Sequence, residues 1–510
     1  MIYVTPSQMK AIEKASDESG VSLLNLMQNA GTSLTESILA INIDLSKGIV
    51  FLCGGGNNAG DGFVSAKQLA EIGLPITVAL LCGEPSTLLS TEVFCDLSES
   101  SAEVLYLNDN IDKIFAKISS ASLVVDAVFG TGFHGDLPPQ VKACFSYVTR
   151  SKTPIAAVDV PSGGDCLTGE FAENSLSCDY TITFSNPKIG IELYPLKNIC
   201  GEVIIADIGI PSAAFHNVDH TISDINFSQM KTIIPERSPT SHKGDFGRLV
   251  NISGSAKMVG AAGMSTLAAL RSGVGLCTVA SAKSVTTALS SSIFEAIYLP
   301  LEENSDGEIS FSNAKKILSA CEKATAVTIG CGLGVSDDTK NLVEFLLNNL
   351  SCTVILDADG INALASRIDI IKNAKASIII TPHVKELARL MSVSTEEAIK
   401  NRFDYAISLA EAGVTVVAKG VPTIIAGGNG FCYINTNGNS GLSRGGSGDV
   451  LTGIIGSFAA QGISPTDAAV AGTFLHGLAA DRVAEKLSMQ GMLPTDIIAE
   501  LPLLFKEMNR

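Results

Sequence analysis

The chain has 510 residues, a formal net charge of −17 and a pI near 4.8, with a mean hydropathy of +0.32. Its length predicts more than one domain, and its acidity argues against non-specific binding to nucleic acid or to anionic membranes. No uncharged apolar stretch is long enough to span a bilayer, and the first 16 residues lack the basic and apolar regions of a signal peptide. We therefore expect a cytoplasmic protein that binds neither nucleic acid nor membrane.

The first part of the chain reads as an α/β unit. Helical patterns at 7–18 and 22–41 precede apolar runs that alternate with further helices, such as 61–73 and 139–149. The strands that we expect here are 48–54, 76–83, 123–130, 155–163, 180–185 and 201–209. Their continuous Val, Ile and Leu content is typical of parallel strands buried on both faces, where most of the 12 scattered Cys also belong.

The loop sequence GGGNNAGDG follows the first of these strands. It fits a degenerate dinucleotide fingerprint through Gly54, Gly56 and Ala59, but the acidic residue expected about 20 positions later is missing. Glycine lets backbone approach a phosphate, and the Asn57-Asn58 pair with a carboxylate offers oxygen ligands for a hard cation. The alternative is an ordinary capped turn between a strand and a helix.

Two further strand ends carry similar residues. DAVFGTGFHGD (126–136) and DVPSG (159–163) end neighbouring strands, and loops at the carboxyl ends of parallel strands meet at one crevice. Asn58, Asp126 and Ser162 could jointly hold a monovalent cation through oxygen atoms. Lys188 in NPKIG is either a charged catalytic or phosphate contact or a solvated loop lysine.

The strand and helix alternation stops at Gly209, and residues 211–245 are polar and interrupted by prolines. A second series of strands follows at 248–255, 276–281, 326–332, 352–360, 377–383, 414–420 and 423–428, and the chain ends in helices. We place the domains at 1–215 and 225–510.

Several strand ends of the second series carry groups that bind ligands. They are GCGLG (330–334), LDADGIN (356–362), TPHVKELARLM (381–391) and AKGVPTII (418–425). Each alone is compatible with ordinary turn chemistry. Together they predict a second site at the carboxyl edge of a sheet.

The run from Asn439 to Gly462 is the most informative stretch. Glycine and serine residues lead into an apolar helix whose first turn carries Asp449. A helix start of this kind binds phosphate, so a carboxylate there suggests a base that deprotonates a hydroxyl before it attacks a phosphoryl group. The alternative is an acidic cap on a buried helix.

The motifs occur in the order QNAG, GGGNNAGDG, DAVFGTGFHGD, DVPSG, NPKIG, HKGDFG, GCGLG, LDADGIN, TPH, KG and GGSGDVLTG. In this order and over nearly the whole chain, the sequence resembles the bifunctional NAD(P)H-hydrate repair proteins, which join an NAD(P)H-hydrate epimerase to an ADP-dependent NAD(P)H-hydrate dehydratase. The resemblance implies an N-terminal Rossmann-like three-layer αβα domain and a C-terminal ribokinase-like domain. It also implies the substrates NADHX and NADPHX, the co-substrate ADP, K⁺ in the epimerase and Mg²⁺ in the dehydratase.

The resemblance also implies site residues. K⁺ would bind Asn58, Asp126 and Ser162, and the catalytic groups that we infer are Asp159, the weaker candidate Lys188, and Asp449. The epimerase site would contain Asn57, Asn58, Ala59, Gly60, Asp61, Gly130, Thr131, Gly132, Phe133, His134, Gly135, Asp136 and Asp159. The hydrate site of the dehydratase would contain Gly332, Gly334, His383, Val384, Lys385, Glu386, Leu387, Ala388, Arg389 and Asp449. ADP would bind Lys419, Gly420, Val421, Pro422, Thr423, Asn439, Ser440, Gly441, Leu442, Ser443, Arg444, Gly445, Gly446, Ser447 and Gly448.

The sequence departs from the family pattern at a few places. Val384-Lys385 replaces a usual Pro-Gly, Cys331 stands where proline is common, Ala59 replaces a glycine, and Leu442–Arg444 differ from the usual small residues. None of these changes removes a proposed catalytic group. Two other functions are alternatives: a kinase of small hydroxylated metabolites, and a dinucleotide-binding scaffold with degenerate sites. We also expect a homo-oligomer, since apolar helices near both ends offer surface for assembly.

Overall fold

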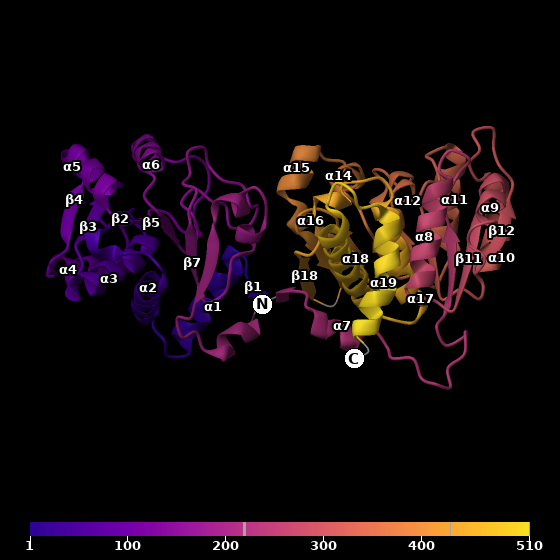
Figure 1. Cartoon of the computed structure of the whole chain (residues 1–510), viewed down its shortest axis with the longest axis horizontal. Helices are drawn as coiled ribbons and strands as arrows, with labels where there is room; N and C mark the ends of the chain where they lie inside the picture. Colours follow the sequence, from indigo (N-terminus) through magenta and orange to yellow (C-terminus); the bar gives the residue numbers. More distant parts are fainter. Residues whose placement is uncertain (218–220, 429, 509–510) are drawn as a thin grey trace. The chain divides into compact units, whose positions relative to one another are not determined.

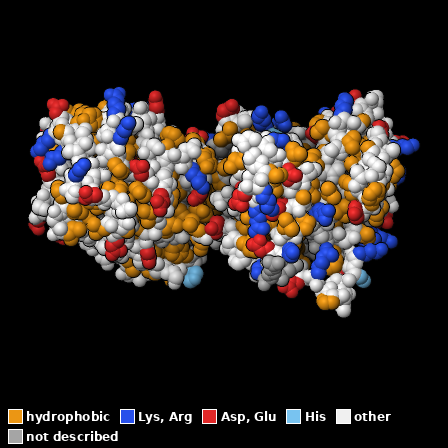
Figure 2. Space-filling view, in the orientation of Figure 1, with side chains coloured by type: hydrophobic (Ala, Val, Ile, Leu, Met, Phe, Trp, Pro, Cys, Tyr) orange, Lys and Arg blue, Asp and Glu red, His pale blue; other side chains and the backbone are white. Residues whose placement is uncertain are grey.

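The computed structural model describes residues 1–217, 221–428 and 430–508. The chain divides into two units, Met1–Thr221 and Ile222–Arg510 (Figure 1). Charged side chains of both signs are interspersed with apolar ones on the face of each unit drawn in Figure 2. Within the described residues, no helix is both long and apolar enough to cross a membrane.

The first unit is built on a parallel sheet with the strand order β4-β3-β2-β5-β6-β7-β8. Its strands are β2 (Ile49–Cys53), β3 (Ile76–Leu80), β4 (Glu103–Tyr106), β5 (Leu123–Ala127), β6 (Ile155–Val158), β7 (Tyr180–Phe184) and β8 (Glu202–Ala206), and the short strand β1 (Ile2–Tyr3) is not part of this sheet. Its α-helices are α1 (Pro6–Glu18), α2 (Leu23–Ala40), α3 (Asn57–Glu71), α4 (Leu88–Ser98), α5 (Leu107–Ser120) and α6 (Pro139–Ser151).

Side-chain alternation along β2 makes this unit a three-layer structure. Ile49, Phe51 and Cys53 pack in one apolar core with α2, α3 and α4. Val50 and Leu52 pack in another with α5 and α6. The sheet is therefore covered on both faces, as the continuous apolar strand sequences predict.

Glycine allows α2 to lie directly against α3. A Cβ at Gly31 would stand 2.4 Å from Val64 Cβ and 2.9 Å from the Asp61 carbonyl oxygen. The QNAG motif thus fixes the position of the first turns of α3, which carry the Asn-Asn-Ala-Gly-Asp sequence.

The second unit has a larger, mixed sheet in the order β9-β18-β17-β16-β15-β14-β13-β10-β11-β12. β17 is antiparallel to its neighbours β16 and β18, and the pairs from β16 to β12 are parallel. The strands are β9 (Thr221–Asp224), β10 (Arg248–Ile252), β11 (Leu276–Ala282), β12 (Ile297–Leu301), β13 (Ala326–Ile329), β14 (Thr353–Leu356), β15 (Ile378–Ile380), β16 (Thr415–Ala418), β17 (Thr423–Ala426) and β18 (Phe431–Asn435).

The α-helices of this unit are α7 (Phe227–Ile233), α8 (Val259–Arg271), α9 (Lys283–Leu289), α10 (Ala314–Cys321), α11 (Asp337–Asn349), α12 (Asp359–Asn362), α13 (Ile368–Lys372), α14 (Val384–Met391), α15 (Thr395–Lys400), α16 (Arg402–Glu411), α17 (Ser447–Ala460), α18 (Pro465–Leu487) and α19 (Pro494–Met508). The central one is α17, whose residues 450–460 are all buried. It packs against α8, α18 and α19 in one apolar core (Figure 1). A Cβ at Gly453 would lie 2.1 Å from the Ser265 carbonyl oxygen, so glycine is what allows α8 to approach.

The predicted strands occur where the sequence indicates, but β4, β9, β12, β18 and the two-residue β1 were missed. β4 and β12 are edge strands that are partly exposed, and β12 contains Pro300, so their apolar signal is weak. The helix predicted from residue 61 begins at Asn57, which places the Asn-Asn pair in its first turn rather than in a loop.

Candidate active sites

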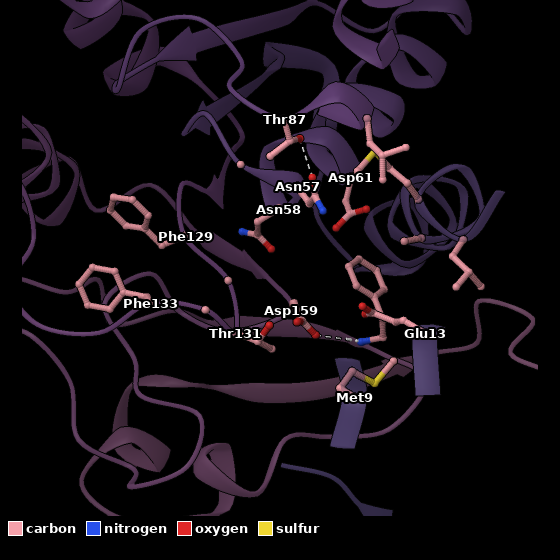
Figure 3. A pocket seen from close by; sticks show the side chains of 18 of the residues that line it. Met9, Glu13, Asn57, Asn58, Asp61, Thr87, Phe129, Thr131, Phe133 and Asp159 are labelled. Carbon is pink, nitrogen blue, oxygen red and sulfur yellow. Dashed lines mark hydrogen bonds between the residues drawn. The ribbon is translucent and has the colours of Figure 1, made fainter. Parts of the chain in front are cut away.

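A cavity of about 630 Å³ opens in the first unit at the carboxyl ends of the strands. α1, α2 and α3 form one side, and the loop after β5 contributes residues 128–134. Figure 3 shows Asn57, Asn58 and Asp61 approaching the cavity from α3, with Thr131 and Asp159 across from them. The loops that the sequence predicts to converge therefore line one cavity.

Asp159 and Lys188 form a buried ion pair in this cavity. Lys188 is only 1% exposed, which excludes the solvated loop lysine. Its ammonium donates to Asp159 Oδ1, which also accepts from Thr183 Oγ1 at 3.0 Å and from the Phe184 N–H at 3.3 Å. Asp159 has φ +66°, a left-handed conformation that is strained for a residue other than glycine. The backbone just after β6 thus turns this carboxylate into the cavity.

Asp126 lies beside the cavity and is fully buried. Its Oδ2 accepts from the Ser162 N–H at 2.8 Å and its Oδ1 from Ser162 Oγ at 2.6 Å. Burial raises the pKa of Asp126 to about 6, although the hydrogen bonds from Ser162 and Val128 oppose the shift. Among the described residues no cationic side chain pairs with this carboxylate.

Asn58 is held close to the same place. A Cβ on Gly130 would stand 2.9 Å from Asn58 Oδ1, and Asn58 Nδ2 is buried without a hydrogen-bond partner. Phe129 links the Asn58 side of the loop to Ser162, because it precedes Gly130 and its N–H donates to Ser162 Oγ at 2.8 Å. Asn58, Asp126 and Ser162 therefore provide oxygen atoms around the residue 128–130 loop.

Not all of the residues predicted for this site line the cavity. Ala59 and Gly60 are buried in α3, and Gly135 and Asp136 lie beyond the lining, with Asp136 Oδ1 at 3.9 Å from Lys142. The sequence reading missed Glu13 of α1, a lining residue that has no local motif. It also missed Thr87, whose hydroxyl donates to Asn57 Oδ1 at 2.6 Å.

In the second unit, Asp449 lies on the first turn of α17. The helix begins after Gly446, at φ +100°, without a side-chain cap. Burial and then the nearby Asp357 carboxylate raise the pKa of Asp449 to about 6. An uncapped helix start attracts anions, and a carboxyl of this pKa suits a base that works near neutral pH.

Asp357, directly after β14, is the buried centre of this site. Its Oδ1 accepts from Thr381 Oγ1 at 2.7 Å and from Lys419 Nζ at 2.8 Å, and its Oδ2 accepts from Thr452 Oγ1 at 2.7 Å. Burial opposes ionisation, but the Lys419 ammonium and these hydrogen bonds lower the pKa of Asp357. Likewise burial disfavours the Lys419 ammonium, yet Asp357 and Glu386 raise its pKa.

His383 caps α14 at the edge of this centre. Its Nδ1 accepts from the backbone N–H groups of Lys385 at 3.0 Å and Glu386 at 3.3 Å. Its Nε2 lies 3.2 Å from Glu386 Oε1, and the His383 N–H donates to Oε2 at 2.8 Å. Burial and the charge of Lys419 lower the pKa of His383, and burial raises the pKa of Glu386 to about 7. The histidine is thus a neutral cap, and the Val384-Lys385 replacement leaves this capping intact.

The loops predicted to bind nucleotide flank the same centre. The turn Lys419–Thr423 joins β16 to β17, and Asn439 caps the 3₁₀ helix Ser440–Leu442 that leads to α17. Asp481 of α18 accepts from the Gly438 N–H at 2.8 Å and from Asn439 Nδ2 at 2.9 Å. Gly332 and Gly334 adopt positive φ angles in the neighbouring loop.

Other predicted members lie further out. Leu387 and Ala388 are packing residues of α14, and Arg389 is exposed and donates to Asn362 Oδ1 at 2.7 Å. The sequence reading did not single out Asp357, although LDADG was noted as a strand end. It named Cys331 only as a departure from the family pattern, whereas the structure places its buried thiol 3.8 Å from Asp357 Oδ2.

Two family models match the chain. One, described as NAD(P)H-hydrate dehydratase, matches residues 249–503, and one described as YjeF-related protein N-terminus matches residues 23–190. A solved ADP/ATP-dependent NAD(P)H-hydrate dehydratase from Bacillus subtilis, co-crystallised with ATP and Mg²⁺, is 32% identical with a TM-score of 0.50. It covers 56% of this chain and 98% of its own. The prediction of a Rossmann-like and a ribokinase-like domain is confirmed.

Curated relatives match over the full length. The bifunctional NAD(P)H-hydrate repair enzyme of Moorella thermoacetica is 31% identical, over 100% of this chain and 97% of that protein. The enzyme of the same name from Escherichia coli is 33% identical, over 96% of this chain and 90% of that protein. With both units accounted for in one relative, the chain belongs to the family of bifunctional NAD(P)H-hydrate repair enzymes.

Proposed function

We propose that the chain repairs hydrated nicotinamide dinucleotides by two coupled activities. The first unit interconverts the R and S forms of NADHX and NADPHX. The second dehydrates the S form to NADH or NADPH while ADP is converted to AMP and phosphate. Residues 1–215 are assigned to the epimerase and 225–510 to the dehydratase. The observation that carries this proposal is Asp449 on the uncapped first turn of α17, beside Lys419 and Asp357, in a chain that also holds a second polar cavity.

In the epimerase, the hydroxyl at C6 of the nicotinamide ring must leave one face and return to the other. The Asp159 carboxylate, paired with Lys188, is the proton-transfer group that we assign to one face. Asn57, oriented by Thr87, and the loop of residues 130–134 would hold the dinucleotide in the cavity.

A potassium ion fits the residues beside this cavity. The Asp126 carboxylate is buried with only neutral partners, and the buried Asn58 amide is incompletely hydrogen-bonded. A buried charge without a counter-charge is costly, and oxygen ligands suit a hard monovalent cation. Asn58, Asp126 and Ser162 would hold K⁺, which would fix the loop of residues 128–130 and neutralise Asp126.

In the dehydratase, Asp449 removes the proton of the C6 hydroxyl, and the oxygen attacks the β-phosphoryl group of ADP. AMP is displaced, and the hydroxyl becomes a phosphate ester. Phosphate then leaves C6 while a proton is lost from C5, which restores the dihydropyridine. The N–H groups of Gly445–Gly448 and the Lys419 ammonium would stabilise the charge on the transferring phosphoryl group.

We expect Mg²⁺ to bind as a complex with the nucleotide. Ligand atoms of Cys331, Asp357 and Asp449 lie within 4.8 Å of one another, but both oxygens of Asp357 already accept hydrogen bonds, one of them from Lys419. Mg²⁺ commonly binds through substrate phosphates and water, and there it would neutralise phosphate charge.

The test is to incubate the protein with hydrated NADH, with and without ADP. We expect the near-ultraviolet absorbance of the dihydronicotinamide to return only with the nucleotide, and to account for both hydrate epimers. Persistence of the R form would contradict the epimerase assignment. Accumulation of a stable phosphorylated product without recovery of NADH would instead indicate a kinase.

A further inference from the structure

Two further carboxyl groups line the cavity of the first unit together with the Asp159–Lys188 pair. Glu13 comes from α1 and Asp61 from α3, and both line the cavity. Figure 3 shows the carboxyl groups of Glu13, Asp61 and Asp159 turned toward the same central space. In the described part of the chain, neither Glu13 nor Asp61 hydrogen-bonds or pairs with a basic side chain.

Inversion at C6 requires proton transfer on both faces of the nicotinamide ring. The departing hydroxyl must receive a proton on one face, while the incoming water must lose a proton on the other. Asp159 and Lys188 lie together on one wall, because their side chains are in direct contact. A second proton-transfer group is therefore required across the cavity.

We propose that Asp61 is this second proton-transfer group and that Glu13 is the neighbouring carboxyl that keeps the proton on it. The inference rests on the proposed epimerase function. In one direction the C6–O bond breaks as the N1 lone pair forms an N1=C6 double bond, and Asp61 gives its proton to the departing hydroxide. Water then adds to the opposite face of C6, its electron pair closing the N1=C6 bond back to nitrogen, and its proton passes to Asp159. Each turnover leaves Asp61 as the carboxylate and Asp159 protonated. Exchange with solvent water returns the proton to Asp61, so no other reactant is needed.

The electrostatic surroundings support this division of roles. Burial, followed by the charges of Asp159 and Glu13, raises the pKa of Asp61 well above its ordinary value, and Lys188 opposes the shift. Burial and then Asp159 also raise the pKa of Glu13, against Lys188 and Lys10. A carboxyl group whose pKa is raised thus faces a carboxylate paired with an ammonium.

Asn57 and His134, two other polar residues of the cavity, already have partners. The Asn57 amide accepts from Thr87 and has no proton to exchange at neutral pH. His134 Nδ1 lies 3.2 Å from Asp165 Oδ2. Asp61 and Glu13 are the lining carboxyls that remain for proton transfer.

The test compares Asp61→Asn and Glu13→Gln with controls on the same helices. Asp17→Asn on α1 and Glu71→Gln on α3 change exposed carboxylates outside the cavity. Epimerisation is measured in the full chain by chromatographic separation of the R and S hydrates, and ADP-dependent dehydration of the S hydrate reports the folding of the rest of the chain. For Asp61→Asn we expect kcat to fall about 100-fold or more, with KM changed less than about threefold.

The pH profile of Glu13→Gln separates an electrostatic role of Glu13 from a purely structural one. Removing the Glu13 charge lowers the pKa of Asp61, so the loss of activity at high pH should begin at a lower pH. Asp61→Glu, which keeps the acid, should recover part of the kcat that Asp61→Asn loses.

Three results would overturn the proposal. Wild-type kcat in Asp61→Asn with only a raised KM would make Asp61 a binding residue. If Glu13→Gln loses epimerase activity at the same high pH as the wild type, Glu13 does not raise the pKa of Asp61. If the wild-type protein does not accelerate epimerisation above the uncatalysed rate, while it still dehydrates the S hydrate, the proposed epimerase itself fails and this inference fails with it.

Discussion

Replacing Asp449 by Asn tests the assignment of the dehydratase base. The substitution keeps the shape of the side chain but removes its ability to take a proton from the C6 hydroxyl. Loss of a general base typically lowers kcat by about 10²–10⁴-fold. Epimerisation in the first unit should be unchanged, which gives an internal control for folding. Asp369→Asn, an exposed first-turn aspartate of α13, is the matched control.

The pH dependence of the wild-type enzyme follows from the same group. With a pKa of about 6, raised from the ordinary 3.8, Asp449 is mostly ionised at pH 7 and mostly protonated at pH 5. Since the base works as the carboxylate, the rate should fall at least tenfold or so between pH 7 and pH 5, whereas an unshifted aspartate would change it by less than about 10%.

The assay follows NADH recovery from the S hydrate at saturating ADP across this pH range. The residual activity of Asp449→Asn should lack the acid limb. A limb that persists in this variant belongs to another group, for example the nucleotide phosphate, and a variant with more than about a third of wild-type activity would refute the base assignment.

Three further predictions concern the first unit. Gly31→Ala should destabilise it by about 1–3 kcal/mol through overpacking against α3; the urea concentration that abolishes epimerisation should fall, and an unchanged concentration would contradict the packing argument. Gly130→Ala should displace the Asn58 amide and raise the K⁺ concentration needed for half-maximal epimerisation, so identical K⁺ titrations would dissociate Asn58 from the ion. Lys188→Met leaves Asp159 buried without its counter-charge, so the free energy of unfolding of the first unit should fall by about 3–5 kcal/mol. A urea titration of epimerase activity measures this loss, and a loss below about 1 kcal/mol would contradict the prediction.

The features that sequence reasoning found are those encoded in short contiguous stretches. The apolar runs gave the buried parallel strands, and the glycine-rich segment before Asp449 gave the start of α17, because both signals depend on neighbouring residues. The convergence of the loops with Asp126 and Ser162 followed from the rule that parallel strands end at the same edge.

The features that it missed depend on packing between distant segments. Glu13 is one carboxylate on an ordinary amphipathic helix, and only the placement of α1 brings it to the cavity. Asp357 follows an apolar strand directly, and its importance appears only when Thr381, Lys419 and Thr452 converge on it. The sequence left Lys188 undecided between solvent and site because burial is not visible in its neighbours.

The hydrogen bond from Lys419 to Asp357 makes the basicity of Asp449 depend on whether a nucleotide is bound. Lys419 stabilises Asp357 and lowers the pKa of Asp449, and its ammonium lies at the glycine-rich start of α17, 3.5 Å from where a Cβ on Gly448 would stand. Once nucleotide phosphates attract this ammonium, Asp357 acts more strongly on Asp449 and makes it a stronger base. A hydrate that binds without a nucleotide meets a weaker base, so the nucleotide would both supply the phosphoryl group and activate Asp449, with the lysine as the shared counter-ion.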